Sequence, residues 1–433
     1  MSRCYLRDIK MNDESSDDEY EEIVLALVEK SIKEDTPRRR GSIKGRISIQ
    51  RDRSDAHDRL YADYFRDQPV FPSHIFRQRF RMKRPLFLRI HNAVVNHDSY
   101  FVQKRNAAGV LGLSSLQKIT AALRMIAYGT SADQVDEYLQ IGESIAIVSL
   151  KRFVKAVVEI FGDEYLRSPN NDDIVRLLAI GEQRGFRGML GSIDCMHWKW
   201  KNCPKAWHGM YSGHIHEPTI ILEAVASNDL WIWHAFFGLP GSHNDINVLE
   251  QSSVFAKLAE GHAPEVKYKI MDNEYNMGYY LADGIYPQWA TFVKTIPAPQ
   301  GRKHKHIADL QEGYRKDVER AFGVLQARFA IIRGPVRFWN QEDLANIMTA
   351  CVIMHNMIIE DERKDNRNIH QLHKDYDNVP RGPPIPSVSR EPTSSFMEFL
   401  ANHDRIRDRQ THSQLQKDLI EHLWKLHGDY DNN

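Results

Sequence analysis

The sequence predicts an α/β protein in which a mixed β-sheet with helices follows an all-α region. Two changes in the hydrophobic pattern along the chain predict this class. From residue 114 to 162, apolar residues recur at intervals of three and four, as on one face of a helix. From about residue 188, β-branched and aromatic residues instead form short runs separated by turn-forming residues, as in strands. The all-α part is expected over residues 69–180 and the sheet over 181–362.

Composition limits the classes of protein that fit. The chain has 433 residues, 42% of them hydrophobic, enough for one large domain with accessory segments or for two to three ordinary domains. Its 58 basic and 58 acidic residues cancel, so net charge gives no argument for nucleic-acid binding. The distribution is uneven, however, because residues 8–22 are acidic whereas Arg38–Arg53 and Arg77–Arg89 are basic.

Cysteine usage and the lack of long apolar runs bear on the compartment. The chain contains four cysteines, namely Cys4, Cys195, Cys203 and Cys351. They show neither CxxC spacing nor a disulfide-like pattern, which favours a reducing compartment. No stretch reaches the roughly 18 to 20 apolar residues of a membrane span, and the N-terminus lacks the apolar core of a secretion signal. We expect no membrane association. The basic residues from Arg38 to Arg46 are a candidate nuclear import signal, so the nucleus is expected and the cytoplasm is the alternative.

The first 68 residues are expected to be mostly disordered, because their charge blocks and few aromatic residues cannot offset chain entropy. A short helix over EEIVLALVEKSIK is the exception. Folding is expected to begin near Val70, where FPSHIFRQRFRMKRPLFLRIHNAVV places aromatic residues among basic ones.

A helix, a tight turn, a helix, a turn and a further helix are predicted from Ser114 onward. Apolar positions such as Leu116 and Ile119 mark the first helix, Gly129 breaks it, and Ser131 begins the next. Such a three-helix cluster occurs in DNA-binding helix-turn-helix modules and also in bundles that bind nothing. Both interpretations remain open at this point.

The following elements have the order of the ribonuclease H-like fold. Three strands are predicted in MLGSIDCMHWKW, EPTIILEAVAS and LWIWHAFFG, then a helix in NVLEQSSVFAKLAE with Asn247 and Glu250 in capping-box spacing. Two strands follow in YYLAD and ATFVKTI, and a helix runs from about Gly313 to Phe329. Residues 363–433 are expected to form a Pro-rich linker and a terminal amphipathic helix from about Ser395.

Four acidic residues are the candidate catalytic and metal-binding groups, namely Asp194, Asp245, Asp283 and Glu319. Phosphodiester cleavage by two metals needs a few carboxylates from separate elements, and oxygen ligands suit Mg²⁺ and Mn²⁺. In the predicted strand order, Asp194 lies in the first strand and Asp283 ends the fourth strand beside it. Glu319 lies at the border of the apolar stripe of the final helix, so these three can meet.

Each acid also has a plain structural explanation. Asp245 suits a helix start, Asp283 precedes a glycine as in a turn, and Glu319 can pair with Arg315 one helical turn earlier. Asp194 is the hardest to explain in this way, because Asp is depleted inside apolar strands. A zinc site is not favoured, because the nearby cysteines and histidines lack paired spacing. Those residues are Cys195, His197, Cys203, His208, His214 and His216.

These segments resemble the Harbinger-type transposase-derived nucleases, in the plant transposon protein branch of the DDE superfamily. The motifs that carry the resemblance are GSIDCMHWKWKNCPKAWHGMYSG, PTIILEAVASNDLWIWHAFFGLPGSHNDINVL, YYLADGIYPQWATFVKTI, KDVERAFGVLQARFAIIRGP and IMTACVIMHNMIIEDER. The resemblance covers about residues 70–362. It implies a ribonuclease H-like core with a helix-turn-helix-like region before it, the four carboxylates as metal ligands, and a separate Myb-like partner.

One position departs from the pattern of related bacterial insertion-sequence enzymes, in which Arg, Glu and Lys follow at fixed spacing. Arg315 and Glu319 fit that pattern, but Gln326 stands where the Lys is expected, which puts a contact to DNA phosphate in doubt.

The sequence therefore predicts a Mg²⁺- or Mn²⁺-dependent DNA endonuclease of transposase origin. The alternatives are a domesticated, catalytically idle DNA- or chromatin-associated regulator and an RNA-cleaving enzyme on the same fold. Topology favours Asp283 over Asp245 as the second catalytic carboxylate, and both are retained. Whether the protein is a homo-oligomer stays open.

Overall fold

The computed structural model describes residues 49–213, 215–255, 266–363 and 404–431. The predicted helix in EEIVLALVEKSIK, the candidate import signal at Arg38–Arg46 and the Pro-rich linker lie outside the described residues. Residues from Arg51 onward belong to one unit by their internal contacts. No helix in the described part of the chain is long and apolar enough to cross a membrane.

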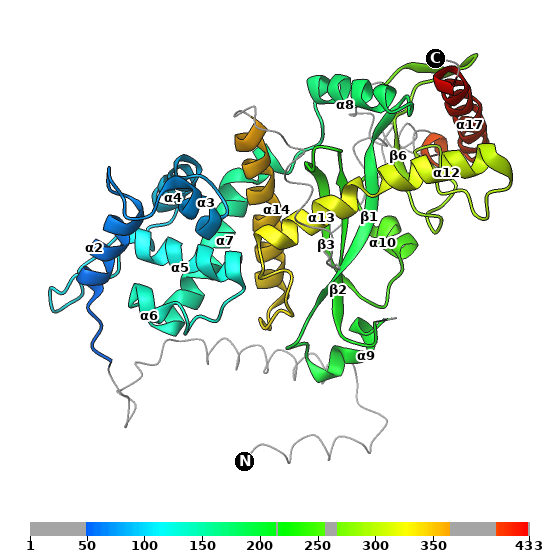
Figure 1. The fold of residues 1–433 in the computed structure, drawn as a ribbon. Helices are drawn as coiled ribbons and strands as arrows, with labels where there is room; N and C mark the ends of the chain where they lie inside the picture. The colour runs from blue at the N-terminus through cyan, green and yellow to red at the C-terminus, as the bar shows by residue number, and fades with distance from the viewer. Residues whose placement is uncertain (1–48, 214, 256–265, 364–403, 432–433) are drawn as a thin grey trace, which may run out of the picture. The chain divides into compact units, whose positions relative to one another are not determined.

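A helical region precedes the sheet (Figure 1). Its helices are α2 (Arg53–Tyr64), α3 (Ser73–Phe80), α4 (Arg84–His97), α5 (Ser115–Tyr128), α6 (Asp136–Leu139), α7 (Glu143–Tyr165) and α8 (Asn171–Gln183). The expectation that folding begins near Val70 is wrong for α2. This helix buries Ala56, Leu60 and Tyr64, and the Tyr64 ring stacks on Phe71 with centroids 5.1 Å apart. Three buried residues at intervals of four suffice to anchor it.

The helices predicted from Ser114 are confirmed as α5, α6 and α7. Ser114 and Gln117 form a capping box at the start of α5, and Gly129 ends that helix in the left-handed conformation. A Cβ at Gly129 would also lie 2.9 Å from the Ala330 carbonyl oxygen, so the close approach of the two chain segments requires glycine.

A five-stranded mixed sheet follows, with the strand order β3-β2-β1-β6-β7. Its strands are β1 (Met189–Lys199), β2 (Thr219–Ala226), β3 (Ile232–Pro240), β6 (Tyr279–Ala282) and β7 (Phe292–Lys294). The central strand β1 pairs antiparallel with β2 and parallel with β6. A small hairpin of β4 (Tyr268–Ile270) and β5 (Asn273–Tyr275) stands apart from the sheet. This order confirms the ribonuclease H-like α/β fold expected from the sequence.

Helices cover both faces of the sheet. On one face, α13 (Asp317–Arg328) packs through Val318, Phe322 and Leu325, which lie in the same core as Met196 of β1. On the other face, α10 (Asp245–Gln251) packs through Val248 against Cys195 and Ile221. Residues 194 and 195 therefore point to opposite faces, as successive residues of a strand must.

Three helix starts differ from the expected ones. Helix α6 begins at Asp136, five residues after the expected start at Ser131. The cap of α10 is Asn244, whose side chain accepts a hydrogen bond from the Asn247 backbone N–H, so Asn247 is not the capping residue. The helix expected from Gly313 is two helices, α12 (Gly301–Arg315) and α13, which meet at Lys316. The first turns of α12 consist of basic and polar residues, so they lack the apolar periodicity by which a helix is predicted from sequence.

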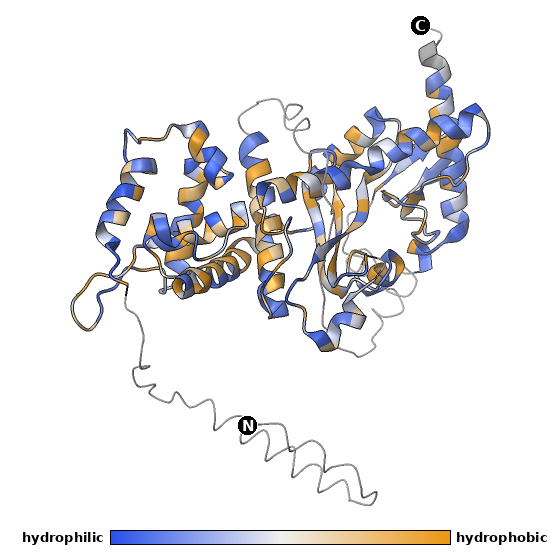
Figure 2. Cartoon of the chain, turned by 60° about the horizontal axis from the view of Figure 1, so that its bottom comes forward, coloured by the Kyte–Doolittle hydropathy of each residue, from blue (hydrophilic) through white to orange (hydrophobic). Residues whose placement is uncertain are grey.

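The remaining helices complete two cores. The long helix α14 (Gln341–Arg363) is buried over most of its length and packs against α7 and β3. The C-terminal helix α17 (Arg409–Asp431) packs on α12, β4 and β7. The second core joins residues of α17 to β1, β6, β7 and α12, namely Leu415, Leu419, Leu423, Met189, Tyr279, Leu281, Val293 and Ile307. Figure 2 shows hydrophobic residues along the strands and on the helices packed against them.

Candidate active site

Arg315 joins three carboxylates at the end of α12. Its Nη1 lies 3.3 Å from Asp194 Oδ2 and 3.0 Å from Glu319 Oε1, and its Nη2 lies 2.8 Å from Glu312 Oε1. The three acids come from β1, α13 and α12. The structure therefore brings together two of the four acids predicted from the sequence and adds Glu312, which the sequence analysis missed.

Asp194 is almost completely buried within β1. Its side chain is 5% exposed, and its Oδ1 accepts a hydrogen bond of 2.8 Å from the backbone N–H of Cys195. A buried carboxylate of this kind is tolerated only with charged and hydrogen-bonding partners, and Arg315 supplies the charge. The hydrogen bond to its own strand holds the carboxylate in place.

Asp283 lies directly after β6, and its side chain is exposed. The parallel pairing aligns Ser192 with Leu281, so continuing that register by two residues places Asp283 beside Asp194 on the same face. Lys294 at the end of β7 is close enough to interact with it: burial lowers the pKa of Lys294, and the charge of Asp283 opposes that shift. The position predicted for Asp283 from strand order alone thus agrees with the register.

Glu319 and Glu312 lie on either side of Arg315 along the chain. Glu319 is in the first turn of α13, where a negative charge suits the helix N-terminus, and its side chain is 31% exposed. The hydrogen bond from Arg315 lowers the pKa of Glu312, and burial opposes this. The spacing of three and four residues between these charges is the signal that could have identified Glu312. It was missed because the predicted helix began at Gly313.

Asp245 belongs to a different element from the acids around Arg315, which lie on β1, α12 and α13. It is the first residue of α10, which packs on the other face of the sheet. There its charge acts on a buried thiol: burial raises the pKa of Cys195, and the charge of Asp245 raises it further. The same two effects raise the pKa of Tyr286, whose hydroxyl lies 3.7 Å from the Cys195 sulfur.

Gln326 lies in the core, and no part of it is exposed. Its Nε2 is 3.6 Å from the sulfur of Met196 in β1. The departure from the insertion-sequence pattern therefore falls at a position where α13 packs on the sheet, and not at an exposed position.

The basic segment Arg77–Arg89 is largely engaged within the protein. Arg77 pairs with Glu362, Lys83 lies 3.0 Å from Asp361, and Arg89 lies 3.1 Å from Glu164. The Arg79 guanidinium lies over the Phe71 ring, 4.0 Å from its centroid. Much of the positive charge that the sequence shows here joins α3 and α4 to α14 and α7.

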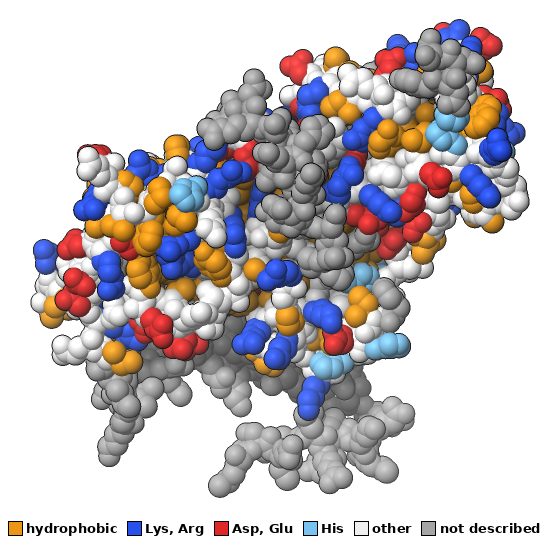
Figure 3. Space-filling view, in the orientation of Figure 1, with side chains coloured by type: hydrophobic (Ala, Val, Ile, Leu, Met, Phe, Trp, Pro, Cys, Tyr) orange, Lys and Arg blue, Asp and Glu red, His pale blue; other side chains and the backbone are white. Residues whose placement is uncertain are grey.

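The donor chemistry of the site fits a hard divalent cation. Asp194, Asp283, Glu312 and Glu319 offer carboxylate oxygens from separate elements, which is the ligand type that Mg²⁺ and Mn²⁺ prefer. Across the described residues, no three His, Cys, Asp or Glu side chains stand in a ready-made metal-binding arrangement. In this structure the positive charge between Asp194 and Glu319 is the guanidinium of Arg315. Figure 3 shows acidic side chains gathered where α12 and α13 cross the sheet.

Comparison with known proteins gives the family of this region. Residues 163–366 match the model of the plant transposon protein family, and residues 57–95 match a domain of unknown function (DUF8418). The chain is 24% identical over 275 residues to "Protein ALP1-like" of Arabidopsis thaliana. The match covers 60% of this chain and 65% of that relative, so the chain spans just under two thirds of the relative's length. No solved structure matches. Residues 163–366, which contain all four predicted acids, thus form a domain of the plant transposon protein family, and the resemblance to Harbinger-type transposase-derived proteins is confirmed.

Proposed function

We propose that the protein is a divalent-metal-dependent DNA endonuclease of transposase origin, which cleaves or transfers phosphodiester strands. The observation that carries the proposal is the convergence of Asp194 and Glu319, from β1 and α13, on the one guanidinium of Arg315. Asp283 lies in register beside Asp194. Acids brought together on one face of a ribonuclease H-like sheet concentrate negative charge where a cation can replace the guanidinium.

In this proposal, Asp194, Asp283 and Glu319 hold Mg²⁺ or Mn²⁺. When bound, the two cations would activate the attacking oxygen and neutralise the leaving oxygen. The protein's own residues fix the ligands in place: the Cys195 backbone N–H holds Asp194, and Glu312 binds Nη2 of Arg315 while Nη1 contacts Asp194 and Glu319. Water or a DNA 3′ hydroxyl is the proposed nucleophile, and no side chain forms a covalent intermediate.

The proposal also includes the binding partners and the cellular compartment. The substrate is DNA, the expected place is the nucleus, and a Myb-like protein that assists targeting follows from the family resemblance. Asp245, which lies on the other face of the sheet, is proposed only to assist, through the local field that it shares with Cys195 and Tyr286.

The experiment is a nicking assay on supercoiled plasmid with Mn²⁺. Asp194→Ala is expected to lower the rate by at least about a hundredfold, because the removed metal ligand accounts for several kcal/mol of transition-state stabilisation. Asp272→Ala, at an exposed acid between β4 and β5, is the matched control and keeps the wild-type rate. Cleavage unaltered by Asp194→Ala would exclude this site.

A catalytically idle DNA- or chromatin-associated regulator is the second candidate. The observation that favours it is that Arg315 already neutralises Asp194 and Glu319 within the protein. In that case no variant nicks plasmid with any divalent metal, whereas DNA binding remains and is unchanged by Asp194→Ala.

A further inference from the structure

Asp194, Glu312 and Glu319, joined by Arg315, are called the acidic group below. An exposed aromatic and basic surface lies at the far end of β1 from this group. Its apolar members are Trp207, Met210 and Trp339, which are 40%, 49% and 66% exposed. The same two chain segments carry four exposed cations, namely Lys201, Lys205, Arg333 and Arg337. We call these seven residues the tryptophan surface. It is built from the turn after β1, with the short helices η1 (Lys205–Trp207) and α9 (His208–Tyr211), and from the segment between α13 and α14.

The two segments that make the tryptophan surface are fixed to each other. The Lys201 N–H donates to the Val336 carbonyl and the Val336 N–H donates to the Lys199 carbonyl, both at 2.9 Å. The buried Trp200 donates its Nε1–H to the Phe338 carbonyl at 2.8 Å and packs edge-on to Tyr211, with ring centroids 5.1 Å apart. The exposed rings therefore rest on a rigid base, which lowers the entropy cost of binding a ligand.

The charge of the tryptophan surface has one sign. No Asp or Glu lies between Asp194 and Glu217, or between Glu319 and Glu342. Within the described residues, no ion pair joins the four cations to a carboxylate. Figure 3 shows Lys, Arg, His and hydrophobic side chains intermingled in the region of α9, where acidic ones are few. Exposed indole rings among unneutralised cations match a ligand that offers flat rings and phosphates together.

We infer that the tryptophan surface binds a nucleic-acid strand with unpaired bases, which stack on Trp339 and Trp207 while the four cations contact its phosphates. The inference rests on the proposed function in taking nucleic acid as the ligand. Asp194 and Trp200, the residue after β1, are six positions apart, about 20 Å at the usual rise of a strand. That length corresponds to about six nucleotides at the 3.4 Å spacing of a duplex strand, which is an upper count for an extended single strand. A strand cut at the acidic group therefore reaches the tryptophan surface about six nucleotides away.

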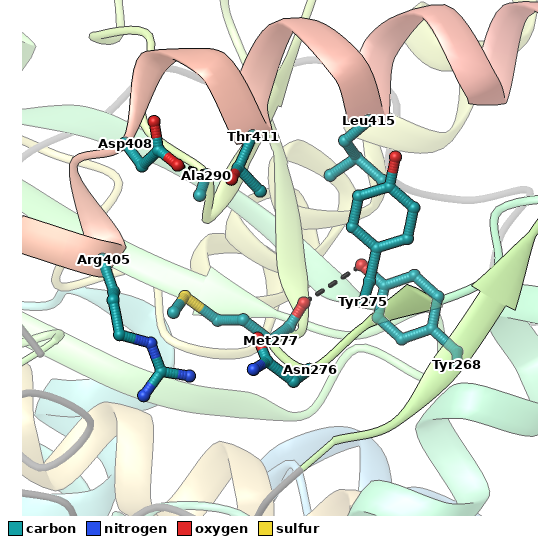
Figure 4. Close-up of a pocket in the computed structure, with 9 residues that line it drawn as sticks. All are labelled: Tyr268, Tyr275, Asn276, Met277, Ala290, Arg405, Asp408, Thr411 and Leu415. Carbon is teal, nitrogen blue, oxygen red and sulfur yellow. Dashed lines mark hydrogen bonds between the residues drawn. The ribbon is translucent and has the colours of Figure 1, made fainter. Parts of the chain in front are cut away.

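The pocket in Figure 4 is a rival ligand site. It lies between the β4–β5 hairpin and the start of α17 and is lined by Tyr268, Tyr275, Arg405 and Asp408 among others. Tyr268 already donates to the Met277 carbonyl at 3.0 Å, and the Tyr275 hydroxyl donates to Asp418 at 2.6 Å, so its polar groups serve the packing of α17.

The test is fluorescence anisotropy with labelled oligonucleotides and the full chain in EDTA, where no metal-dependent cleavage occurs. The probes are single-stranded dT20, a blunt duplex, and the same duplex with a six-nucleotide single-stranded end. Trp339→Ala is expected to weaken binding of dT20 and of the tailed duplex by about tenfold, because base stacking on one aromatic ring has about that effect. Lys205→Gln with Arg337→Gln is expected to reduce the slope of log affinity against log salt for dT20 by about 1.4.

Control variants separate this site from general effects. Val175→Ala, at a residue of α8 that is 68% exposed, matches the loss of an exposed apolar side chain, and Lys417→Gln on α17 matches the loss of charge. Both keep wild-type affinity. Asp194→Ala keeps the affinity for dT20 while losing nicking activity, so failure of the proposed function and failure of this inference give different results.

Three outcomes would overturn the inference. Wild-type affinity of the Trp339→Ala and Lys205→Gln/Arg337→Gln variants for all probes would show that no strand contacts the surface. Equal loss on blunt duplex and dT20 would show phosphate binding without base stacking. Unchanged DNA affinity combined with loss of a self-association or protein contact, seen by analytical ultracentrifugation, would assign the surface to a protein.

Discussion

Asp194 and Arg315 form an ion pair 3.3 Å long in which the two side chains are only 5% and 10% exposed. Burial alone would lower the pKa of Arg315, but the hydrogen bond to Glu312 and the charges of Asp194 and Glu319 raise it above its ordinary value. The guanidinium therefore stays charged at every pH at which the protein is folded. It acts as a permanent counter-cation for the acidic group.

Replacing this cation gives the first prediction. Arg315→Gln is expected to lower the free energy of unfolding by about 3 kcal/mol in EDTA, since it leaves a buried carboxylate without its charged partner. Added Mn²⁺ should stabilise the variant more than the wild type, because the guanidinium no longer competes. Urea unfolding with and without Mn²⁺ measures both effects, and Arg333→Gln at an exposed arginine is the control. Equal stability of variant and wild type in EDTA would contradict the prediction.

Metal affinity can decide whether Asp283 or Asp245 is the second catalytic carboxylate. Asp283→Asn is expected to weaken Mn²⁺ binding more than about tenfold, because Asp283 lies in register with Asp194 and supplies a charged ligand. Asp245→Asn should change it by less than about twofold, since α10 lies on the other face. Isothermal titration of the two variants decides. A larger effect of Asp245→Asn would place the second ligand on α10.

The C-terminal helix is expected to support the site from a distance. Leu419→Ala removes a side chain that is 2% exposed from the second core and should cost about 2–5 kcal/mol of stability. Tyr279 and Leu281 of β6 share that core, so the variant should also bind Mn²⁺ more weakly through the displacement of Asp283. Lys417→Ala, on the exposed side of the same helix, is the control for both measurements. Loss of stability without loss of metal affinity would separate the helix from the site.

Acid sensitivity should come partly from His355. Burial lowers its pKa from 6.5 to about 3, with a further contribution from the charge of Arg328, while a hydrogen bond to the Leu230 carbonyl opposes the shift. The unfolded chain binds a proton below pH 6.5 and the folded chain does not, so stability is lost as the pH falls from 6.5 toward 3. Between pH 7 and 5 this amounts to about 2 kcal/mol. Urea unfolding at both pH values should show a loss smaller by that amount in His355→Gln than in the wild type.

Restoring the lysine of the insertion-sequence pattern should not help DNA binding. Gln326→Lys would place an ammonium group in the core between α13 and β1, where no part of the side chain is exposed. We expect a loss of several kcal/mol in stability and no gain in affinity for duplex DNA. Thermal unfolding and anisotropy together test this, and tighter DNA binding by a stable variant would show that position 326 reaches the surface.

The strand order and the Asp194–Asp283 pair could be predicted because they depend on patterns that are local and strong. β1, β2 and β3 are long and rich in β-branched and aromatic residues, and once they are placed, the parallel neighbour of β1 follows from the fold class. The start of α2 could not be predicted, because only three of its residues are buried and the rest are polar. Its contacts with α5 and α6, and the packing of Tyr64 on Phe76 and Phe80 of α3, are tertiary and do not show in a local pattern.

The acidic group and the tryptophan surface were predictable to different extents. Asp194 was identified because Asp is unusual inside an apolar strand, and Glu319 because it lies at the border of the apolar stripe of its helix. Glu312 and the role of Arg315 depended on where α12 begins, which the polar residues of its first turns conceal. Trp207 and Trp339 lie far apart in sequence, and their segments are brought together by tertiary hydrogen bonds such as that of Lys201 with Val336.

The guanidinium between Asp194 and Glu319 also separates folding from metal binding, two events that many metalloproteins combine. Because Arg315 offsets part of the negative charge of these carboxylates with a group encoded in the chain, we expect the polypeptide to fold in a cell depleted of free magnesium or manganese. Under the proposed function, binding of a divalent cation would then be a later and reversible event, and nicking activity would follow the supply of the ion without any change in the amount of folded protein.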